Sequence, residues 1–392
     1  MSSQTRLNRR STRGFTVLAL GAASLLSISA CGSDKESTKS TTAATAASTA
    51  ATTAGSTAGS TAASGATEST EEVGVALILK NTTNPFFVSM QKSAEEAASA
   101  DNVKLTVSAG TKDGDEATQI TAIENAISAG DKGILITPNG NGVVPALDKA
   151  RAAGLFVIAL DTPPDPASSV DITFATDNLL AGKLIGQWTA KTLAGGAATI
   201  AMLDLFDDKI VSVDLRRDHG FLEGMGIDVG DETKNGGEAS SGSYSGGTYE
   251  IACHEATQGA EDGGRTAMEN CLSKNPDINV VYTINEPAAN GAYKALQAAG
   301  KEKDAIIVSV DGGCSGVQFV KDGVIGATAQ QYPGKMATLG LKAIADLARG
   351  GAKPSVSSGL DFFNTGVALV TDKPVEGVDS ISVADGLAGC WG

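Results

Sequence analysis

Apolar and polar stretches alternate along most of the chain with the lengths of strands and helices. Residues 73–79, "VGVALIL", form a continuous apolar run of strand length, and residues 88–101 then place apolar side chains at helical spacing. Further strands are predicted at 104–110, 132–138 and 156–163, and further helices at 115–130 and 142–154. The strands are apolar throughout instead of alternating, which is typical of a parallel sheet covered on both faces.

The same pattern restarts after residues 172–193. Strands are predicted at 198–205, 278–284, 305–312, 325–333 and 366–371, and helices at 215–225, 266–276, 287–300, 315–323 and 334–351. The stretch 227–256 is mostly Gly, Ser and other polar residues, and we interpret it as an inserted surface loop. Two successive runs of strand–helix units predict two α/β lobes, each built on a doubly wound parallel sheet.

The first 72 residues do not follow this pattern. Residues 1–30 combine a basic start with an apolar stretch, which is typical of an export signal and short for a membrane span. The small residues before Cys31 resemble a bacterial lipobox, so we predict a lipoprotein signal peptide and lipidation of Cys31. Ordinary secretory cleavage is the alternative. Residues 31–72 are dominated by Ser, Thr, Ala and Gly, and they predict a disordered tether.

Length, charge and cysteine content limit the class of protein. The 392 residues suffice for two domains, and a net charge of -15 without a basic stripe argues against nucleic acid as a partner. Cys253, Cys271, Cys314 and Cys390 remain beyond Cys31, an even number that favours disulfides in an exported chain. Because the chain has only 2 histidines and no CxxC or HxxxH spacing, we expect no metal site.

Polar and aromatic side chains follow several predicted strands, where ligands bind in open parallel sheets. This set includes Lys80, Asn81, Asn84, Phe86, Phe87, Thr137, Asn139, Asp161, Thr162, Asp207, Asp208, Arg217, Asn285, Glu286, Asp311 and Gln331. Planar polar groups can bind vicinal hydroxyls, and aromatic faces pack on the ring of a sugar, so the set suits a sugar ligand. Any one Asp or Asn could instead cap the following helix. No nucleophile–base pair accompanies the set, so we expect binding and no enzyme activity.

Several motifs together resemble the ribose-type periplasmic sugar-binding proteins of ABC transporters. In the family's order they are "NPFF", "DTP", "TDN", "RRDHGF", "NPDINVVYTINEPAANGAYKALQAAGK", "SVDGG" and "ATAQQYP", and the resemblance covers 73–392. Details such as "DTPPDP" and the terminal "CWG" look most like the fructose-binding branch. The resemblance implies the type I periplasmic binding protein fold, in which two doubly wound lobes close on a ligand around a three-segment hinge.

The resemblance also implies lobe boundaries and roles for individual residues. The N-terminal lobe would comprise 73–176 plus 332–362, and the C-terminal lobe 177–331 plus 363–392. Phe86 and Phe87 would stack on the sugar and, with Pro85 opening a helix, neither ring would be needed in the core. Asn84, Asp161, Arg217, Asn285, Asp311 and Gln331 would supply the polar contacts.

Departures from the family's pattern add four further candidates. Thr162 occupies a position where ribose-binding members have Arg, Lys80 replaces a Ser, and Thr137 replaces an Asn. A second aromatic wall is missing from the pattern, and Gln258 is a candidate to substitute for it. These changes favour fructose or a related sugar over ribose.

Disulfide pairing and partners complete the expectations from this resemblance. Cys314 with Cys390 would pin the C-terminal tail, and Cys253 with Cys271 would join the inserted loop to a helix. The function implied is that of a monomeric, lipid-anchored, extracytoplasmic receptor without a cofactor. It would deliver a monosaccharide to an ABC permease whose ATPase is a separate chain, because no Walker A motif is present. The alternatives are a sugar sensor for a chemoreceptor or sensor kinase, and an exported enzyme.

Overall fold

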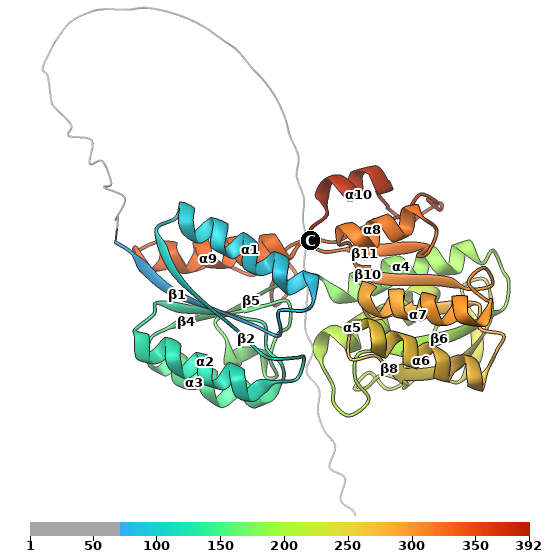
Figure 1. Cartoon of the computed structure of the whole chain (residues 1–392), viewed down its shortest axis with the longest axis horizontal. Helices are drawn as coiled ribbons and strands as arrows, with labels where there is room; N and C mark the ends of the chain where they lie inside the picture. Colours follow the sequence, from blue (N-terminus) through green and yellow to red (C-terminus); the bar gives the residue numbers. More distant parts are fainter. Residues whose placement is uncertain (1–70) are drawn as a thin grey trace, which may run out of the picture. The chain divides into compact units, whose positions relative to one another are not determined.

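Two β-sheets organise the protein (Figure 1). This computed structural model describes residues 71–392. The predicted signal peptide, the lipidation site Cys31 and all but the last two residues of the predicted tether lie outside the described residues. Within the described part, every helix is too short or too polar to cross a membrane.

The first sheet has six parallel strands in the order β12-β5-β4-β3-β1-β2. Its strands are β1 (Val73–Leu79), β2 (Val103–Ala109), β3 (Gly133–Ile136), β4 (Phe156–Leu160), β5 (Ile172–Ala175) and β12 (Phe363–Asn364). Helices α1 (Pro85–Ala100) and α9 (Pro333–Ala348) pack on one face. Helices α2 (Glu116–Ala129) and α3 (Val144–Ala152) pack on the other, α3 being preceded by the short η1 (Asn141–Val143). The apolar strands are thus buried on both sides, as their composition predicts.

The second sheet has seven strands in the order β13-β11-β10-β9-β6-β8-β7, antiparallel only at its two edges. Its strands are β6 (Ala198–Asp204), β7 (Ser241–Tyr244), β8 (Gly247–Ala256), β9 (Val280–Thr283), β10 (Ile306–Asp311), β11 (Ala327–Gln330) and β13 (Ala368–Val370). Helices α4 (Asn178–Thr192) and α5 (Ser212–Met225) cover one face. Helices α6 (Glu261–Lys274), α7 (Glu286–Ala299) and α8 (Cys314–Lys321) cover the other, where α10 (Val383–Gly389) packs against α8. The predicted class of two doubly wound α/β lobes is confirmed.

The prediction of a surface loop over 227–256 is wrong for its second half. Strands β7 and β8 form a hairpin, and β8 pairs in parallel with β6 inside the second sheet. Only some side chains of β8 are buried, Tyr249 and Cys253 among them. A strand near a sheet edge needs few apolar residues, so its polar composition concealed it.

Three chain segments cross between the sheets. They are residues 176–177, 331–332 and 365–367. The Thr176 hydroxyl donates to Gln331 Oε1 at 2.9 Å, and the Thr365 amide donates to the Ala175 carbonyl at 2.9 Å, so the segments lie side by side. Because β12 pairs with β5, residues 363–364 belong to the first sheet and not to the C-terminal lobe, where the predicted boundary had placed them. The other predicted lobe boundaries stay a prediction.

Candidate functional site

A cavity of about 40 Å³ lies between the two lobes at the ends of their strands. Residues of both lobes form its wall. The residues lining it are Lys80, Asn84, Phe86, Phe87, Asp113, Asp161, Leu205, Val213, Arg217, Ile284, Asn285, Asp311 and Gln331. The structure therefore brings together all eight residues to which the family resemblance assigns sugar contacts, and Lys80 with them. The other three candidates, Thr137, Thr162 and Gln258, do not line this cavity.

Asp161 is the carboxylate that the first lobe brings to the cavity, at the end of β4. Its Oδ2 accepts a hydrogen bond from the Thr162 hydroxyl at 2.7 Å. The Lys80 ammonium donates to that hydroxyl at 2.8 Å and lies 3.8 Å from Asp161 Oδ2. Thr137 acts further back, since its hydroxyl accepts from the Lys80 amide at 2.8 Å and ties β1 to β3. Thr162 and Thr137 thus position Asp161 and Lys80.

Asp311 is the corresponding carboxylate of the second lobe, at the end of β10. Its Oδ1 accepts from Gln331 Nε2 at 2.8 Å and lies 3.9 Å from the Arg217 guanidinium. Burial raises the pKa of Asp311 to about 6, although Arg217 and the hydrogen bond from Gln331 act in the opposite direction. Asp311 and Arg217 of the second lobe therefore form one buried charged group together with Gln331 of a crossing segment.

Arg217 is held rigidly although its long side chain is flexible in isolation. Its Nε donates to Asn178 Oδ1 at 2.8 Å, and its Nη1 donates to the Ile284 carbonyl at 3.0 Å. Helix α5, which presents it, packs backbone to backbone against α4, because Gly182 and Gly220 leave no space for a side chain between the two helices. The guanidinium therefore has a fixed place in the cavity wall.

Glu286 supports the site from behind; the sequence places it after a predicted strand, but no ligand contact was predicted for it. This buried carboxylate accepts from the amides of Gly312 and Gly313, at 2.8 and 3.0 Å, and from the Thr328 hydroxyl at 2.8 Å. It thereby fixes the loop that follows Asp311. Burial and the nearby charge of Asp311 raise the pKa of Glu286 to about 8.

The prediction that neither Phe86 nor Phe87 is needed in the core is wrong. Both rings are buried, with 3% and 4% of their surface exposed, and both belong to the apolar cluster between the first sheet and its helices. Helix α1 begins at Pro85, so its first turn already packs on the sheet. The two rings still line the cavity, and Phe86 meets the ring of Trp391 edge to face at 5.3 Å.

Both candidate asparagines cap helices. The sequence had left this role open as an alternative to a ligand contact. Asn84 Oδ1 accepts from the Phe86 amide at 2.9 Å, at the start of α1. Asn285 Oδ1 accepts from the Ala288 amide at 3.0 Å, at the start of α7. Each residue caps its helix and also lines the cavity, so the two roles coexist.

Sequence reasoning missed Asp113 because it skipped the loop after the second strand. That loop emerges at the same edge of the sheet as its neighbours, and this position was the available signal. Asn81 donates to the Asp113 carboxylate. Burial raises the pKa of Asp113, while the Lys80 charge opposes that rise. Asp113 lines the inner cavity and also a wider outer one of about 640 Å³, which Gln258 and Trp391 line as well.

The wall opposite the two phenylalanines is aliphatic. Leu205, Val213 and Ile284 form it from the second lobe, within a small apolar cluster of their own. Gln258, the residue expected to substitute for a second aromatic, lines only the outer cavity. No aromatic residue of the second lobe lines the inner cavity among the residues described.

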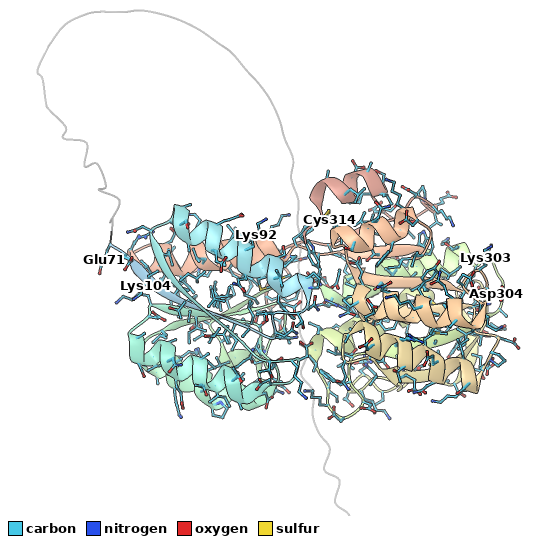
Figure 2. The ribbon with its side chains drawn as sticks, in the orientation of Figure 1. Glu71, Lys92, Lys104, Lys303, Asp304 and Cys314 are labelled. Atoms are coloured by element: carbon cyan, nitrogen blue, oxygen red, sulfur yellow. A yellow bond between two sulfur atoms is a disulfide. The ribbon has the colours of Figure 1, made fainter. Side chains whose placement is uncertain are left out.

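Both predicted disulfides are confirmed. Cys253 in β8 is bonded to Cys271 in α6. Cys314 at the start of α8, labelled in Figure 2, is bonded to Cys390 in the C-terminal tail. The second bond keeps Trp391 beside the site, where the Cys314 amide donates to the Trp391 carbonyl at 2.9 Å.

Comparisons with known proteins agree with this architecture. A family model described as a periplasmic binding protein domain matches residues 75–352. The ribose import binding protein RbsB of Salmonella typhimurium is 28% identical, over 74% of this chain and 88% of its own length. The D-ribose/D-allose-binding protein of Pseudomonas aeruginosa is 27% identical, over 78% and 90% respectively.

Solved structures show the same fold. One is an ABC transporter solute-binding protein from Actinobacillus succinogenes with bound D-allose, with a TM-score of 0.65, 23% identity, and coverage of 76% of this chain and 97% of that chain. Another, from Agrobacterium vitis with bound D-fucose, has a TM-score of 0.64, 24% identity, and coverage of 78% and 97%.

The chain belongs to the periplasmic binding protein family, and the resemblance to ribose-type binding proteins of ABC transporters is confirmed. The type I periplasmic binding protein fold is confirmed with it. Members of this family bind solutes outside the cytoplasm and catalyse no reaction, so the chain is a binding protein and not an enzyme.

Proposed function

We propose that the chain captures a monosaccharide between its lobes and delivers it to an ABC permease driven by a separate ATPase. The observation that supports this most directly is the sharing of one cavity by Asp161 from the first lobe and by Asp311 and Arg217 from the second. Either lobe alone offers only half of the polar contacts, so a ligand with hydroxyls around its whole rim stabilises the closed arrangement. The buried phenylalanines supply an apolar wall for the C–H face of the ring.

Fructose or a related sugar is the ligand that we favour. Thr162 lacks the fork of donors that Arg provides in the ribose-binding proteins that the chain resembles. Here Lys80 brings a cation beside Asp161 from a different strand. An ammonium donates to single hydroxyls and does not make the paired contacts of a guanidinium, so the preferred arrangement of hydroxyls should differ from that of ribose.

A thermal-shift screen tests the proposal. The panel contains fructose, ribose, allose, D-fucose, glucose, galactose, xylose and myo-inositol. A ligand at a hundred times its Kd should add about 2.7 kcal/mol to the free energy of unfolding. If none of these sugars raises the melting temperature, the sugar proposal fails. If ribose binds most tightly, the argument from Thr162 fails while the proposal of a sugar-binding protein stands.

Transport and sensing are separated by an uptake experiment. Deletion of the gene should abolish uptake of the radiolabelled ligand by the host cell. Normal uptake with a lost chemotactic or transcriptional response would instead favour the sensor.

We also propose that the mature protein is a monomer anchored to the cell membrane through a lipid on Cys31. The basic and apolar segment before Cys31 and the small residues next to it support this proposal. Cys31→Ser should shift the protein from the membrane fraction to the soluble fraction without changing sugar affinity. An unchanged membrane fraction would contradict the lipid anchor.

A further inference from the structure

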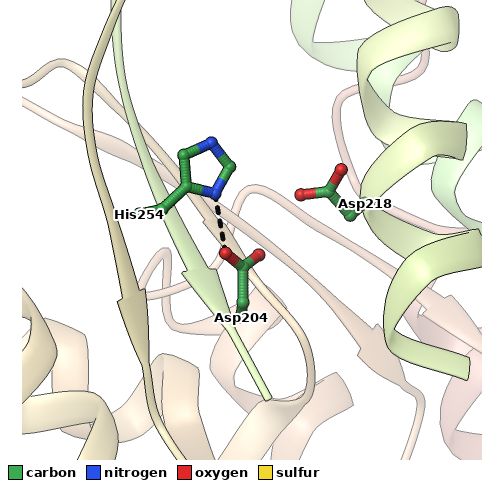
Figure 3. A group of neighbouring side chains, drawn as sticks. All are labelled: Asp204, Asp218 and His254. Atoms are coloured by element: carbon green, nitrogen blue, oxygen red, sulfur yellow. Dashed lines mark hydrogen bonds and ion pairs between the residues drawn. The ribbon is translucent and has the colours of Figure 1, made fainter. Parts of the chain in front are cut away.

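A second group of buried ionisable side chains lies in the C-terminal lobe, outside the cavity between the lobes. Asp204 ends β6, Asp218 lies on α5, and His254 lies on β8 (Figure 3). One nitrogen or oxygen atom from each of the three falls within 4.8 Å of the others. Three elements far apart in the sequence therefore converge on one point.

Asp218 has no hydrogen-bond partner within the described part of the chain. Both of its carboxylate oxygens are unpaired although its exposed fraction is 0%. Its carboxylate is directed toward His254 and Asp204 (Figure 3). One oxygen each of Asp204 and Glu238 is also buried and unpaired. A buried carboxyl group without a hydrogen-bond partner is rare in folded proteins, so Asp218 points to a ligand that would pair with it.

The imidazole of His254 is the only basic side chain bonded within this group among the described residues. Its Nδ1 donates to Asp204 Oδ2 and its Nε2 donates to Glu238 Oε1, both at 2.7 Å. Asp214, buried nearby, adds a further carboxylate to the surroundings of Asp218. Asp204, Asp218 and Glu238 therefore lie beside one imidazole, and Asp214 lies near Asp218.

We propose that Asp204, Asp218 and His254 bind one divalent transition-metal ion, for which Zn²⁺ is the probe. A mixed set of imidazole nitrogen and carboxylate oxygens suits such ions, whereas Ca²⁺ and Mg²⁺ prefer oxygen ligands alone. On binding, His254 Nδ1 releases its proton to solvent and donates its lone pair to the metal, which replaces the hydrogen bond to Asp204. The hydrogen bond from Nε2 to Glu238 remains and orients the ring, as carboxylates do behind metal-bound histidines.

The group is reached from the surface through its own opening. A cavity of about 740 Å³ is lined by Asp204 and His254 and is shared with the exposed loop residues Asp207 and Asp208. None of the residues lining this opening lines the inner cavity between the lobes. A metal ion therefore has an entry path that does not pass through the sugar site.

The sequence-based expectation of no metal site relied on the count of histidines and on local spacing. Spacing reveals ligands that lie on one helix or in one loop, but these three come from β6, α5 and β8. Because Asp218 follows Arg217 directly on α5, the metal would also fix the helix that presents Arg217 to the other cavity.

Metal stoichiometry tests the proposal. The full chain, prepared without a polyhistidine tag and stripped with a chelator, is dialysed to equilibrium against ZnCl₂, CaCl₂ or MgCl₂ and its metal content is measured by mass spectrometry. We expect one Zn²⁺ per chain, bound at least tenfold more weakly by Asp218→Asn and by His254→Gln. Asp208→Asn, which removes an exposed carboxylate from the rim of the same opening, is the matched control and should bind as the unaltered chain does.

Three results would overturn the proposal. They are the absence of bound Zn²⁺, binding of Zn²⁺ by Asp218→Asn and His254→Gln as tight as that by the unaltered chain, and a preference for Ca²⁺ or Mg²⁺ over Zn²⁺. Thermal unfolding gives a second measure. Each protein is compared with itself in the presence and absence of Zn²⁺, so differences in stability between the variants do not matter. Zn²⁺ should raise the melting temperature of the unaltered chain and of Asp208→Asn, but not that of Asp218→Asn. If Asp218→Asn does not fold, the unaltered chain still tests the proposal. The proposal is wrong if Zn²⁺ does not raise the melting temperature of the unaltered chain.

Discussion

The two central aspartates of the site have unusual backbone conformations. Asp161 has a φ of 65° and Asp311 a φ of 151°, a region that favours glycine. Gln258 of the outer cavity has a φ of 55°, so three of the five described non-glycine residues with positive φ are candidate site residues. Such conformations cost about 1–3 kcal/mol each and persist where surrounding contacts enforce them. At Asp311 these contacts come from Gln331 and the loop held by Glu286.

The charge of Asp311 should be essential for sugar binding. We expect Asp311→Asn to weaken binding at least a hundredfold, because a charged hydrogen bond contributes about 1.5–3 kcal/mol and the partner Arg217 is left without its counter-charge. Isothermal titration with the best ligand from the screen measures the effect. The variant should still fold without ligand, which circular dichroism in urea checks. Unaltered affinity in this variant would contradict the role assigned to Asp311.

Glu286 should make stability depend on pH. Its pKa is about 8 in the folded protein against 4.5 for the free side chain, so between these values the folded state keeps a proton that the unfolded state has lost. Its stabilising contribution is complete below about pH 4.5 and is lost as the pH rises through about 8. A proton bound only by the folded state gives a slope of about 1.4 kcal/mol per pH unit.

Glu286→Gln should therefore flatten the decline in stability between pH 5 and pH 8. Urea unfolding at several pH values measures the slope. A residual decline should remain, since burial and the charge of Asp204 also raise the pKa of Asp214 to about 8. Glu96→Gln on the exposed face of α1 is the matched control and should keep the original slope. Equal slopes in the two variants would disprove the assignment to Glu286.

At the scale of elements, the C-terminal tail touches both lobes. The Cys314–Cys390 disulfide ties it to α8 of the second lobe, and a β-bridge joins Gly313 to Trp391. The Trp391 ring contacts Phe86 of the first lobe, and its Nε1 donates to the Gln331 carbonyl in a crossing segment at 2.7 Å. The tail is therefore a strap across one side of the hinge, anchored covalently at one end.

Loss of the Cys314–Cys390 bond should weaken this strap. We expect the double variant Cys314→Ser, Cys390→Ser to lose about 2–4 kcal/mol of stability, because the bond restricts the unfolded chain. Ligand dissociation, followed by stopped flow, should also become faster because Trp391 is no longer held beside Phe86.

The matched control for the tail is Cys253→Ser, Cys271→Ser, which removes the disulfide between β8 and α6. This change should also cost stability but should leave the dissociation rate unaltered, since neither cysteine belongs to the C-terminal tail or lines the inner or the outer cavity. If both double variants dissociate at the same rate, the tail has no influence on the site.

At the scale of the whole molecule, three short segments connect the lobes within residues 71–392. Their mutual hydrogen bonds, such as that from Thr176 to Gln331, keep the crossings together while the cavity side is free to open. Because residues of both lobes line the inner cavity, we expect a sugar to enter it by parting and re-closure of the lobes about these segments.

Ligand should consequently protect both lobes at once from hydrogen exchange. We expect slower amide exchange near Asp161 in the first lobe and near Asp311 in the second, at the same ligand concentration. Mass spectrometry of peptides covering residues 156–163 and 306–313 measures it, with 261–274 on the outer helix α6 as an internal control. Protection confined to one lobe would contradict closure by both.

Much of the fold was predictable because each strand and helix has a local pattern. The apolar run 73–79 coincides with β1, and helices such as α2 and α7 lie within one or two residues of their predicted bounds. The hairpin β7–β8 was missed because a partly exposed strand has no such pattern. The site residues came from the rule that loops at strand ends meet, and Asp113 was missed where the rule was not applied.

The sequence by itself determined the alternation of strands and helices and the polar and aromatic residues at strand ends, since each depends on neighbours along the chain. Only the tertiary structure decided which side chains share a cavity, that Phe86 and Phe87 serve both core and cavity, and that Glu286 and Trp391 support the site. It alone brought Asp204, Asp218 and His254 together. Contacts of this kind depend on how distant segments pack, and a linear pattern of residues does not record that packing.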